Sequence, residues 1–186
     1  MRPLKILCFI AVSAIGTAAS AHVGAAAHSH HSFLAGFLHP LLGLDHLAAM
    51  LAVGLWSALA ARRAGPELLW GPAGFATLLL AGAGLGIQDV VLPAVEPMIA
   101  VSLLATGLLV VTRLRVPGVV ATLGMGVFAV FHGAAHGYEL AGNGNAAQTL
   151  AGMLAATVLL HCAGLVAGWA LRLRLVWWSR AAGAGV

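Results

Sequence analysis

The sequence predicts an all-α fold: a polytopic membrane helix bundle in which five transmembrane helices follow a cleavable N-terminal signal peptide. Composition is the first reason, because 61% of the residues are hydrophobic and only 8% are charged, with a mean hydropathy of +1.01. Length is the second, because five apolar stretches can each cross a hydrocarbon core about 30 Å thick. Charge is the third, because the arginines stand only at alternate ends of these stretches, as the positive-inside rule predicts.

Residues 1–21 have the parts of a secretory signal peptide. A positively charged start precedes an apolar region over 6–18, and Ala19-Ser20-Ala21 is a small-residue cleavage site. The alternative is an uncleaved anchor helix. In both cases the next residues are expected on the outer side of the membrane.

Residues 22–32 are expected to form a histidine-rich external tail. Short histidine-rich tracts commonly bind metal ions. After cleavage, the new α-amine and the first imidazole could also chelate one ion together. The alternative is a solvated leader without a binding role. The candidate ligands in this tail are His22, His28, His30 and His31.

The transmembrane bundle is expected over residues 33–175, with residues 176–186 as a tail beyond it. The connecting segments are short and contain proline or glycine, which is typical of turns between helices. The five predicted spans cover residues 33–61, 68–88, 92–111, 119–137 and 148–171.

The arginines determine the expected orientation. All seven Lys/Arg residues after position 21 are arginines, and each follows the first, third or fifth span. The N-terminus is therefore expected outside and the C-terminus in the cytoplasm. This placement also accounts for the pI near 10.1, so we expect no nucleic-acid partner. Five tryptophans fit an aromatic belt at the cytoplasmic side: Trp56, Trp70, Trp169, Trp177 and Trp178.

Three glycine pairs with a spacing of four predict close helix packing. Small residues at i and i+4 share one helix face and let two backbones approach. The pairs are Gly82 with Gly86, Gly133 with Gly137, and Gly164 with Gly168.

The first span carries His39, Asp45 and His46 in an otherwise apolar run. An ionisable group at a bilayer centre costs about 2.5–3.5 kcal/mol, so such residues are functional candidates. On an uninterrupted helix, the seven-residue spacing places both histidines on one face. Imidazole nitrogens and carboxylate oxygens are ligands for divalent first-row metals. Pro40 either begins this helix or kinks a helix that starts near Phe33.

The fourth span ends with His132, His136 and Glu139, at positions i, i+4 and i+7. They form one stripe if the helix continues to Glu139. The two constellations are expected at compatible depths in the outer half of the membrane, where they can face each other. Together they predict a metal site within the bundle.

His161 in the fifth span is a weaker candidate ligand. We expect it to be a core histidine bonded to a backbone carbonyl. Its neighbour Cys162 points about 100° away around the helix, and we expect it to be an inert packing residue.

Two segments resemble the signatures of the HupE/UreJ family: His39-Pro40-x-x-Gly43-x-Asp45-His46, and Phe131-His132-Gly133-x-x-His136-Gly137-x-Glu139. The resemblance implies a bacterial inner-membrane permease for nickel, with cobalt as the alternative, that supplies hydrogenase or urease maturation and its metallochaperones. It implies ion-handling roles for His39, Asp45, His46, His132, His136 and Glu139. The first motif has one residue more than the H-x4-D-H motif of the larger nickel/cobalt permeases, so membership of that family is not expected.

The sequence thus predicts a passive permease whose divalent ion is cargo, with no tightly bound cofactor and no enzymatic activity. Three rivals use the same residues differently. They are an intramembrane metal-dependent hydrolase, a haem-binding electron carrier, and a metal-binding chaperone or sensor that does not transport.

Overall fold

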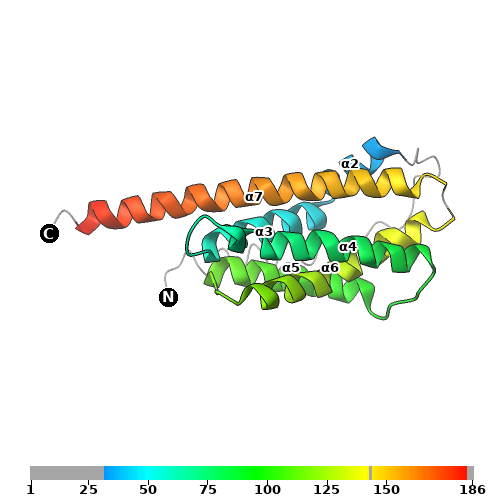
Figure 1. The fold of residues 1–186 in the computed structure, drawn as a ribbon, viewed down its shortest axis with the longest axis horizontal. Helices are drawn as coiled ribbons and strands as arrows, with labels where there is room; N and C mark the ends of the chain where they lie inside the picture. The colour runs from blue at the N-terminus through cyan, green and yellow to red at the C-terminus, as the bar shows by residue number, and fades with distance from the viewer. Residues whose placement is uncertain (1–31, 143, 184–186) are drawn as a thin grey trace.

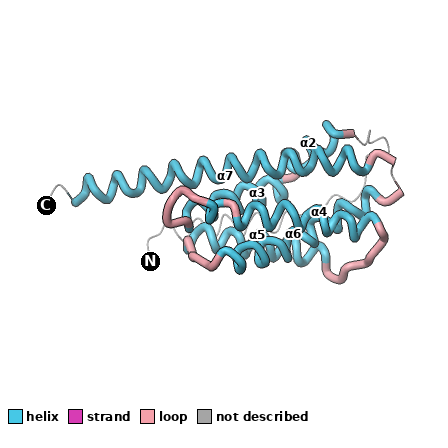
Figure 2. Tube along the Cα trace, in the orientation of Figure 1, coloured by secondary structure: helices cyan, strands magenta, loops and turns pink. Residues whose placement is uncertain are grey.

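The computed structural model describes residues 32–142 and 144–183 (Figure 1). This part of the chain is all-helical and contains no strand (Figure 2). The predicted signal peptide and the tail histidines His22, His28, His30 and His31 lie outside the described residues. The elements are α2 (Phe33–Leu42), α3 (Leu44–Ala60), the 3-10 helix η1 (Pro66–Leu68), α4 (Trp70–Ile87), α5 (Val95–Thr112), α6 (Gly118–Leu140) and α7 (Ala146–Gly183).

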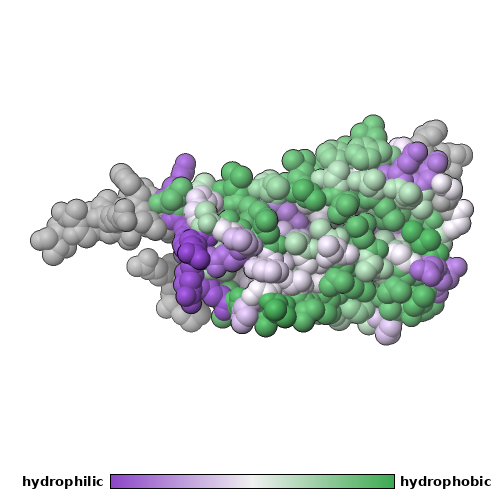
Figure 3. Space-filling model, in the orientation of Figure 1, coloured by the Kyte–Doolittle hydropathy of each residue, from purple (hydrophilic) through white to green (hydrophobic). Residues whose placement is uncertain are grey.

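The helices form an elongated bundle, and α7 runs along its length and projects beyond it at the C-terminal end (Figure 1). Four helices, α4 to α7, are each long and apolar enough to cross a membrane, and the bent pair α2–α3 is a candidate fifth span. Hydrophobic side chains cover most of the middle of the visible face, whereas hydrophilic ones gather at its two ends (Figure 3). This is the surface of a membrane protein, whose lipid-facing band is apolar.

The first predicted span is not one helix. It begins at Phe33, where the Ser32 hydroxyl accepts a hydrogen bond from the Ala35 N–H at 3.2 Å. Pro40 lies inside α2, and the chain then turns by 81° at Gly43 before α3 starts. Pro40 has no N–H to donate, which weakens this end of α2, but the turn falls three residues later. The expectation that His39 and His46 share one helix face is therefore wrong.

Helices α4 and α6 pack against each other through glycines at which close packing was predicted. A methyl group at Gly82 would collide with the Val130 carbonyl oxygen, and one at Gly133 would collide with that of Leu79. At the other end of the contact, Gly74 meets Thr122. Residue numbers thus increase in the same direction along both helices, so α4 and α6 are parallel. Only glycine allows backbones to approach this closely.

Helices α3 and α7 form a second parallel pair in the same way. Gly164 lies against the Leu51 backbone and Gly168 against that of Leu55, while Gly54 faces the His161 carbonyl. The two pairs enclose a hydrophobic core that consists of Met50, Val53, Trp56, Phe75, Leu79, Ala121, Met125, Ala129 and Leu160.

We call the end of the bundle where α3 stops and α6 begins the arginine end. Arg115 Nε donates to the Ala60 carbonyl at 2.9 Å, and the Arg172 guanidinium donates to the Ala61 and Arg62 carbonyls. Ala60 is the last residue of α3, and Ala61 and Arg62 follow it, so the guanidinium groups satisfy acceptors at the helix end.

Trp56 departs from the predicted aromatic belt. Its side chain is buried, and its Nε1 donates to the Leu114 carbonyl at 2.9 Å. Trp70 is about half exposed and does fit an interfacial position. The buried indole instead links α3 to the segment between α5 and α6.

At the opposite end, Tyr138 of α6 holds the loop between α4 and α5 in place through two hydrogen bonds. Its hydroxyl accepts from the Leu92 N–H and donates to the Val90 carbonyl, both at 2.8 Å. α6 continues to Leu140, so the predicted stripe of His132, His136 and Glu139 lies on one helix.

Candidate metal centre

Three histidines from three different helices converge near the end opposite the arginines. We call His39 of α2, His46 of α3 and His136 of α6 the histidine cluster. Their ring centroids lie 4.7 to 5.3 Å apart. Each offers one nitrogen, and these three nitrogens all lie within 4.8 Å of one another. A metal with bonds of about 2.0–2.1 Å holds adjacent nitrogens about 3–4 Å apart, so small ring movements are enough to close the cluster on an ion.

A carboxylate orients the His46 ring. The distance from His46 Nδ1 to Asp45 Oδ1 is 2.9 Å. A carboxylate only accepts hydrogen bonds, so Nδ1 carries the proton and Nε2 keeps a lone pair. Nε2 is buried without a hydrogen-bond partner among the described residues. This carboxylate–histidine arrangement is the one that commonly orients a metal ligand.

Gly43 makes room for that pair. A Cβ at this position would lie 3.1 Å from both Asp45 Oδ1 and His46 Nδ1. Both contacts are tight, so a larger residue would press on the oriented pair. Gly43 therefore lies at the turn between α2 and α3 and also leaves room for the Asp45–His46 pair.

His132 is oriented by a residue that the sequence analysis missed. Its Nε2 lies 2.9 Å from the Ser102 hydroxyl, which itself donates to the Ile99 carbonyl at 2.6 Å. The hydroxyl proton is thus used, so Ser102 accepts from His132 Nε2–H and leaves a lone pair on Nδ1. The signal in the sequence was a hydroxyl pair: Ser102 and Thr106, one turn apart, are the two buried residues of α5.

The His132 ring extends the histidine cluster inward. Its centroid is 5.4 Å from that of His46, and its side chain is fully buried. Its Nδ1 has no hydrogen-bond partner in the described chain. The ionisable residues of the first and fourth predicted spans are therefore brought together.

The two carboxylates lie at different depths. The Asp45 side chain is 26% exposed, whereas that of Glu139 is 58% exposed. Glu139 Oε2 is 3.9 Å from His136 Nδ1, too far for a hydrogen bond. Asp45 thus adjoins the cluster through its hydrogen bond with His46, and Glu139 lies at the rim.

Several nitrogens in the histidine cluster and in the adjacent His132 are unpaired. His46 Nε2, His132 Nδ1 and His136 Nδ1 are all buried without a hydrogen-bond partner among the residues described. A buried polar atom in that state costs about 1–3 kcal/mol. Converging imidazole nitrogens beside carboxylates are the kind of donor set that a divalent first-row metal takes.

The structure corrects two expectations on α7. His161 is buried, but its Nε2 does not bond a carbonyl and has no hydrogen-bond partner in the described part. Cys162 is exposed on the apolar surface rather than packed in the core. His161 is separated from the cluster by Phe75, whose ring lies 5.7 Å from that of His132 and 5.4 Å from that of His161.

Comparisons with known proteins agree with the two motifs. The chain is 42% identical over 166 residues to Protein HupE of Rhizobium leguminosarum bv. viciae, a match covering 89% of this chain and 83% of that protein. No solved structure matches it significantly. The family model described as HupE / UreJ protein matches residues 10–186. The chain therefore belongs to the HupE/UreJ family.

Proposed function

We propose that this protein is a passive permease for a divalent transition-metal ion across the bacterial inner membrane. The observation that carries the proposal is the convergence of His39, His46 and His136 on one point within apolar helices. The ion is cargo rather than a resident cofactor. Nickel is the preferred substrate because of the resemblance to the HupE/UreJ family, and cobalt is the alternative. Imidazole ligands suit several first-row metals, so they do not carry this choice.

The site is built to release an ion as well as to bind one. Transport requires binding that is favourable but reversible. The three nitrogens come from three separate helices and lie up to 4.8 Å apart, so full coordination requires movement. Asp45 offsets part of the ion's charge, and Glu139 at the rim attracts it from outside.

The direction of transport follows from the two ends of the bundle. Arg62, Arg115 and Arg172 meet at the end opposite the histidine cluster, and the positive-inside rule places that end in the cytoplasm. An ion entering at the cluster therefore moves inward. Carrying two charges across 100 mV releases about 4.6 kcal/mol, twice the value for one charge, so the membrane potential is a sufficient driving force. The imported metal would supply metalloenzyme maturation, with metallochaperones of hydrogenase or urease as its recipients.

Uptake into proteoliposomes tests this function. Vesicles with an internal metal indicator and a negative-inside potential would receive nickel, cobalt or zinc outside. We expect uptake by the natural protein and none by His46→Ala, with Cys162→Ala as the control at a lipid-exposed position. Binding of nickel without uptake by the natural protein would favour a chaperone or sensor instead. Hydrolysis of lipid or peptide would favour an enzyme, and a Soret band would indicate a haem carrier.

A further inference from the structure

Two features of the inner half have no role in the proposed site: His161, and a cavity at the arginine end. We propose that His161 is a second, inner site for the same ion, separated from the histidine cluster by the Phe75 ring and followed by that cavity. This inference rests on the proposed permease function and deepens it. It adds the inner half of the ion's path.

His161 has the burial and the free nitrogen of a ligand. Its residue is 3% exposed, and Nε2 has no hydrogen-bond partner in the described chain. Thr157, one turn earlier on the same helix, is a buried polar residue whose hydrogen-bonding group is satisfied. It is fully buried, and its hydroxyl donates to the Met153 carbonyl at 2.8 Å. His161 therefore retains a lone pair that the fold leaves available.

Phe75 stands between the two histidine positions. It is 1% exposed, and its ring meets the His132 ring on one side and the His161 ring, at 90°, on the other. Met50 and Val53 belong to the same packed core. Hydrophobic constrictions of this kind act as barriers to ions. An ion at His132 would thus need a ligand immediately beyond the ring, and His161 is positioned to be that ligand.

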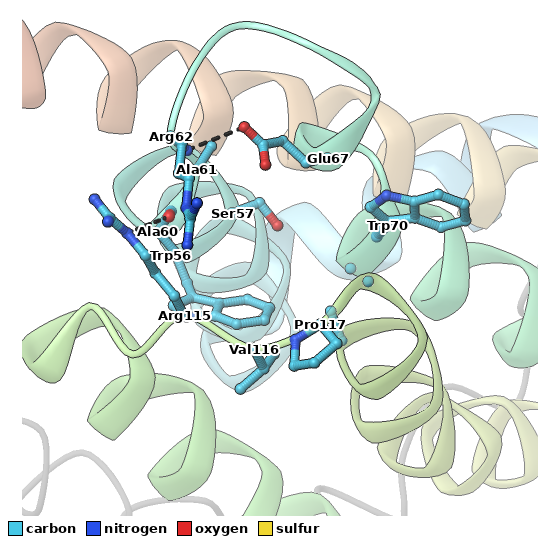
Figure 4. Close-up of a pocket in the computed structure, with 13 residues that line it drawn as sticks. Trp56, Ser57, Ala60, Ala61, Arg62, Glu67, Trp70, Arg115, Val116 and Pro117 are labelled. Atoms are coloured by element: carbon cyan, nitrogen blue, oxygen red, sulfur yellow. Dashed lines mark hydrogen bonds between the residues drawn. The ribbon is translucent and has the colours of Figure 1, made fainter.

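The path continues into the cavity, whose volume is about 450 Å³ (Figure 4). Gly71 lines it and lies one turn from Phe75 along α4. Ser57 lines it too and lies one turn from Gly54, which packs against the His161 carbonyl. A helical turn rises about 5.4 Å, so the cavity is bordered by residues about one turn from Phe75 and from Gly54, which both contact His161.

The walls of the cavity favour departure of a cation. Arg62 and Arg115 line it, and Figure 4 shows both among the labelled side chains. Guanidinium groups carry no lone pair for a metal. Glu67 also lines the cavity, but its Oε1 accepts hydrogen bonds from the Arg62 and Arg63 N–H groups at 3.0 Å. We therefore expect the ion to leave the cavity quickly rather than to bind there.

The test compares His161→Leu with Thr157→Val in reconstituted protein. Both replace a buried polar group on α7, but only the first removes a free nitrogen. We expect His161→Leu to slow nickel uptake at least about tenfold, or about 1.4 kcal/mol in barrier height. Equilibrium nickel binding at the histidine cluster should stay within about twofold of the natural protein, since His161 is not one of the three residues of that cluster. Thr157→Val should keep its uptake rate.

Thermal stability provides a second readout. His161→Leu removes a buried nitrogen without a partner, so its melting temperature should be equal or higher. Slow uptake in a protein of unchanged or raised stability would support the inner site. Uptake by His161→Leu at the natural rate, while His46→Ala is inactive, would overturn the inner site and leave the permease intact. Absence of uptake by the natural protein would overturn the permease function, and the inner site with it.

Discussion

At the arginine end, the named polar groups are paired: Arg115 and Arg172 donate to carbonyls at the end of α3, and Glu67 accepts from two backbone N–H groups. At the histidine cluster, His46 and His136 keep buried nitrogens without a hydrogen-bond partner among the described residues. A paired group stabilises the fold, whereas an unpaired one costs about 1–3 kcal/mol. Substitutions should therefore affect stability at the arginine end and ion handling at the cluster.

The largest effect is expected for Asp45→Asn. The amide keeps the size but removes the charge that offsets a divalent ion and fixes the His46 ring. Partners of metal ligands are typically worth about 10–100-fold, and here a charge is also lost, so we expect uptake to be abolished at normal membrane abundance. Initial rates at equal protein amounts measure this. Near-normal uptake would show that Asp45 is a structural residue, and it would contradict the proposed difference between the histidine cluster and the arginine end.

Ser102→Ala should have the next largest effect. The change frees His132 Nε2, so the ring is no longer held with Nδ1 as the acceptor, and nickel affinity should fall about tenfold. Thr106→Val is the matched control, because the Thr106 hydroxyl donates to the Ser102 carbonyl rather than to a histidine. Equilibrium binding in detergent measures both variants. Equal affinity in the two would show that Ser102 does not orient a ligand.

Arg172→Leu tests the other end of the comparison. Its guanidinium bonds two carbonyls and lies 5.0 Å from the Trp169 ring. We expect a loss of about 1–3 kcal/mol of stability, with nickel affinity unchanged. Arg174→Leu removes the same charge at an exposed position and should cost less. Thermal unfolding with and without nickel distinguishes the two, and a change in affinity would contradict the proposed separation of the two ends.

The smallest effect is expected at Glu67, outside the membrane-spanning helices. Hydrogen bonds from the Arg63 and Arg62 N–H groups hold the pKa of this carboxyl below its ordinary 4.5. Its contribution to stability is thus present above pH 4.5 and is lost as the pH falls through the lowered value. The melting temperature of Glu67→Gln should lie slightly below that of the natural protein at pH 7, and the two should converge in acid. A constant difference across this range would exclude the carboxylate as the cause.

Much of the architecture was predictable because it depends on local sequence. Apolar runs gave α4, α5 and α6 and the start of α7 within a few residues, whereas α7 continues to Gly183, well past the predicted end at residue 171. Glycine spacing gave helix faces that pack closely. The motif residues were predictable for a related reason, since a carboxylate or imidazole is rare in an apolar helix. Whether these residues bind metal stays a prediction.

The sequence alone determined which segments are helical, which faces pack closely and which residues carry metal-binding groups. Only the tertiary structure decided how those groups meet. The 81° turn at Gly43 places His39 on a separate helix that packs through Gly36 against Thr149. The pairing of Ser102 with His132 and the isolation of His161 behind Phe75 likewise join residues far apart in the chain. Periodicity reports which face of a helix is apolar, but the partner of a buried polar atom is fixed only when distant helices pack around it.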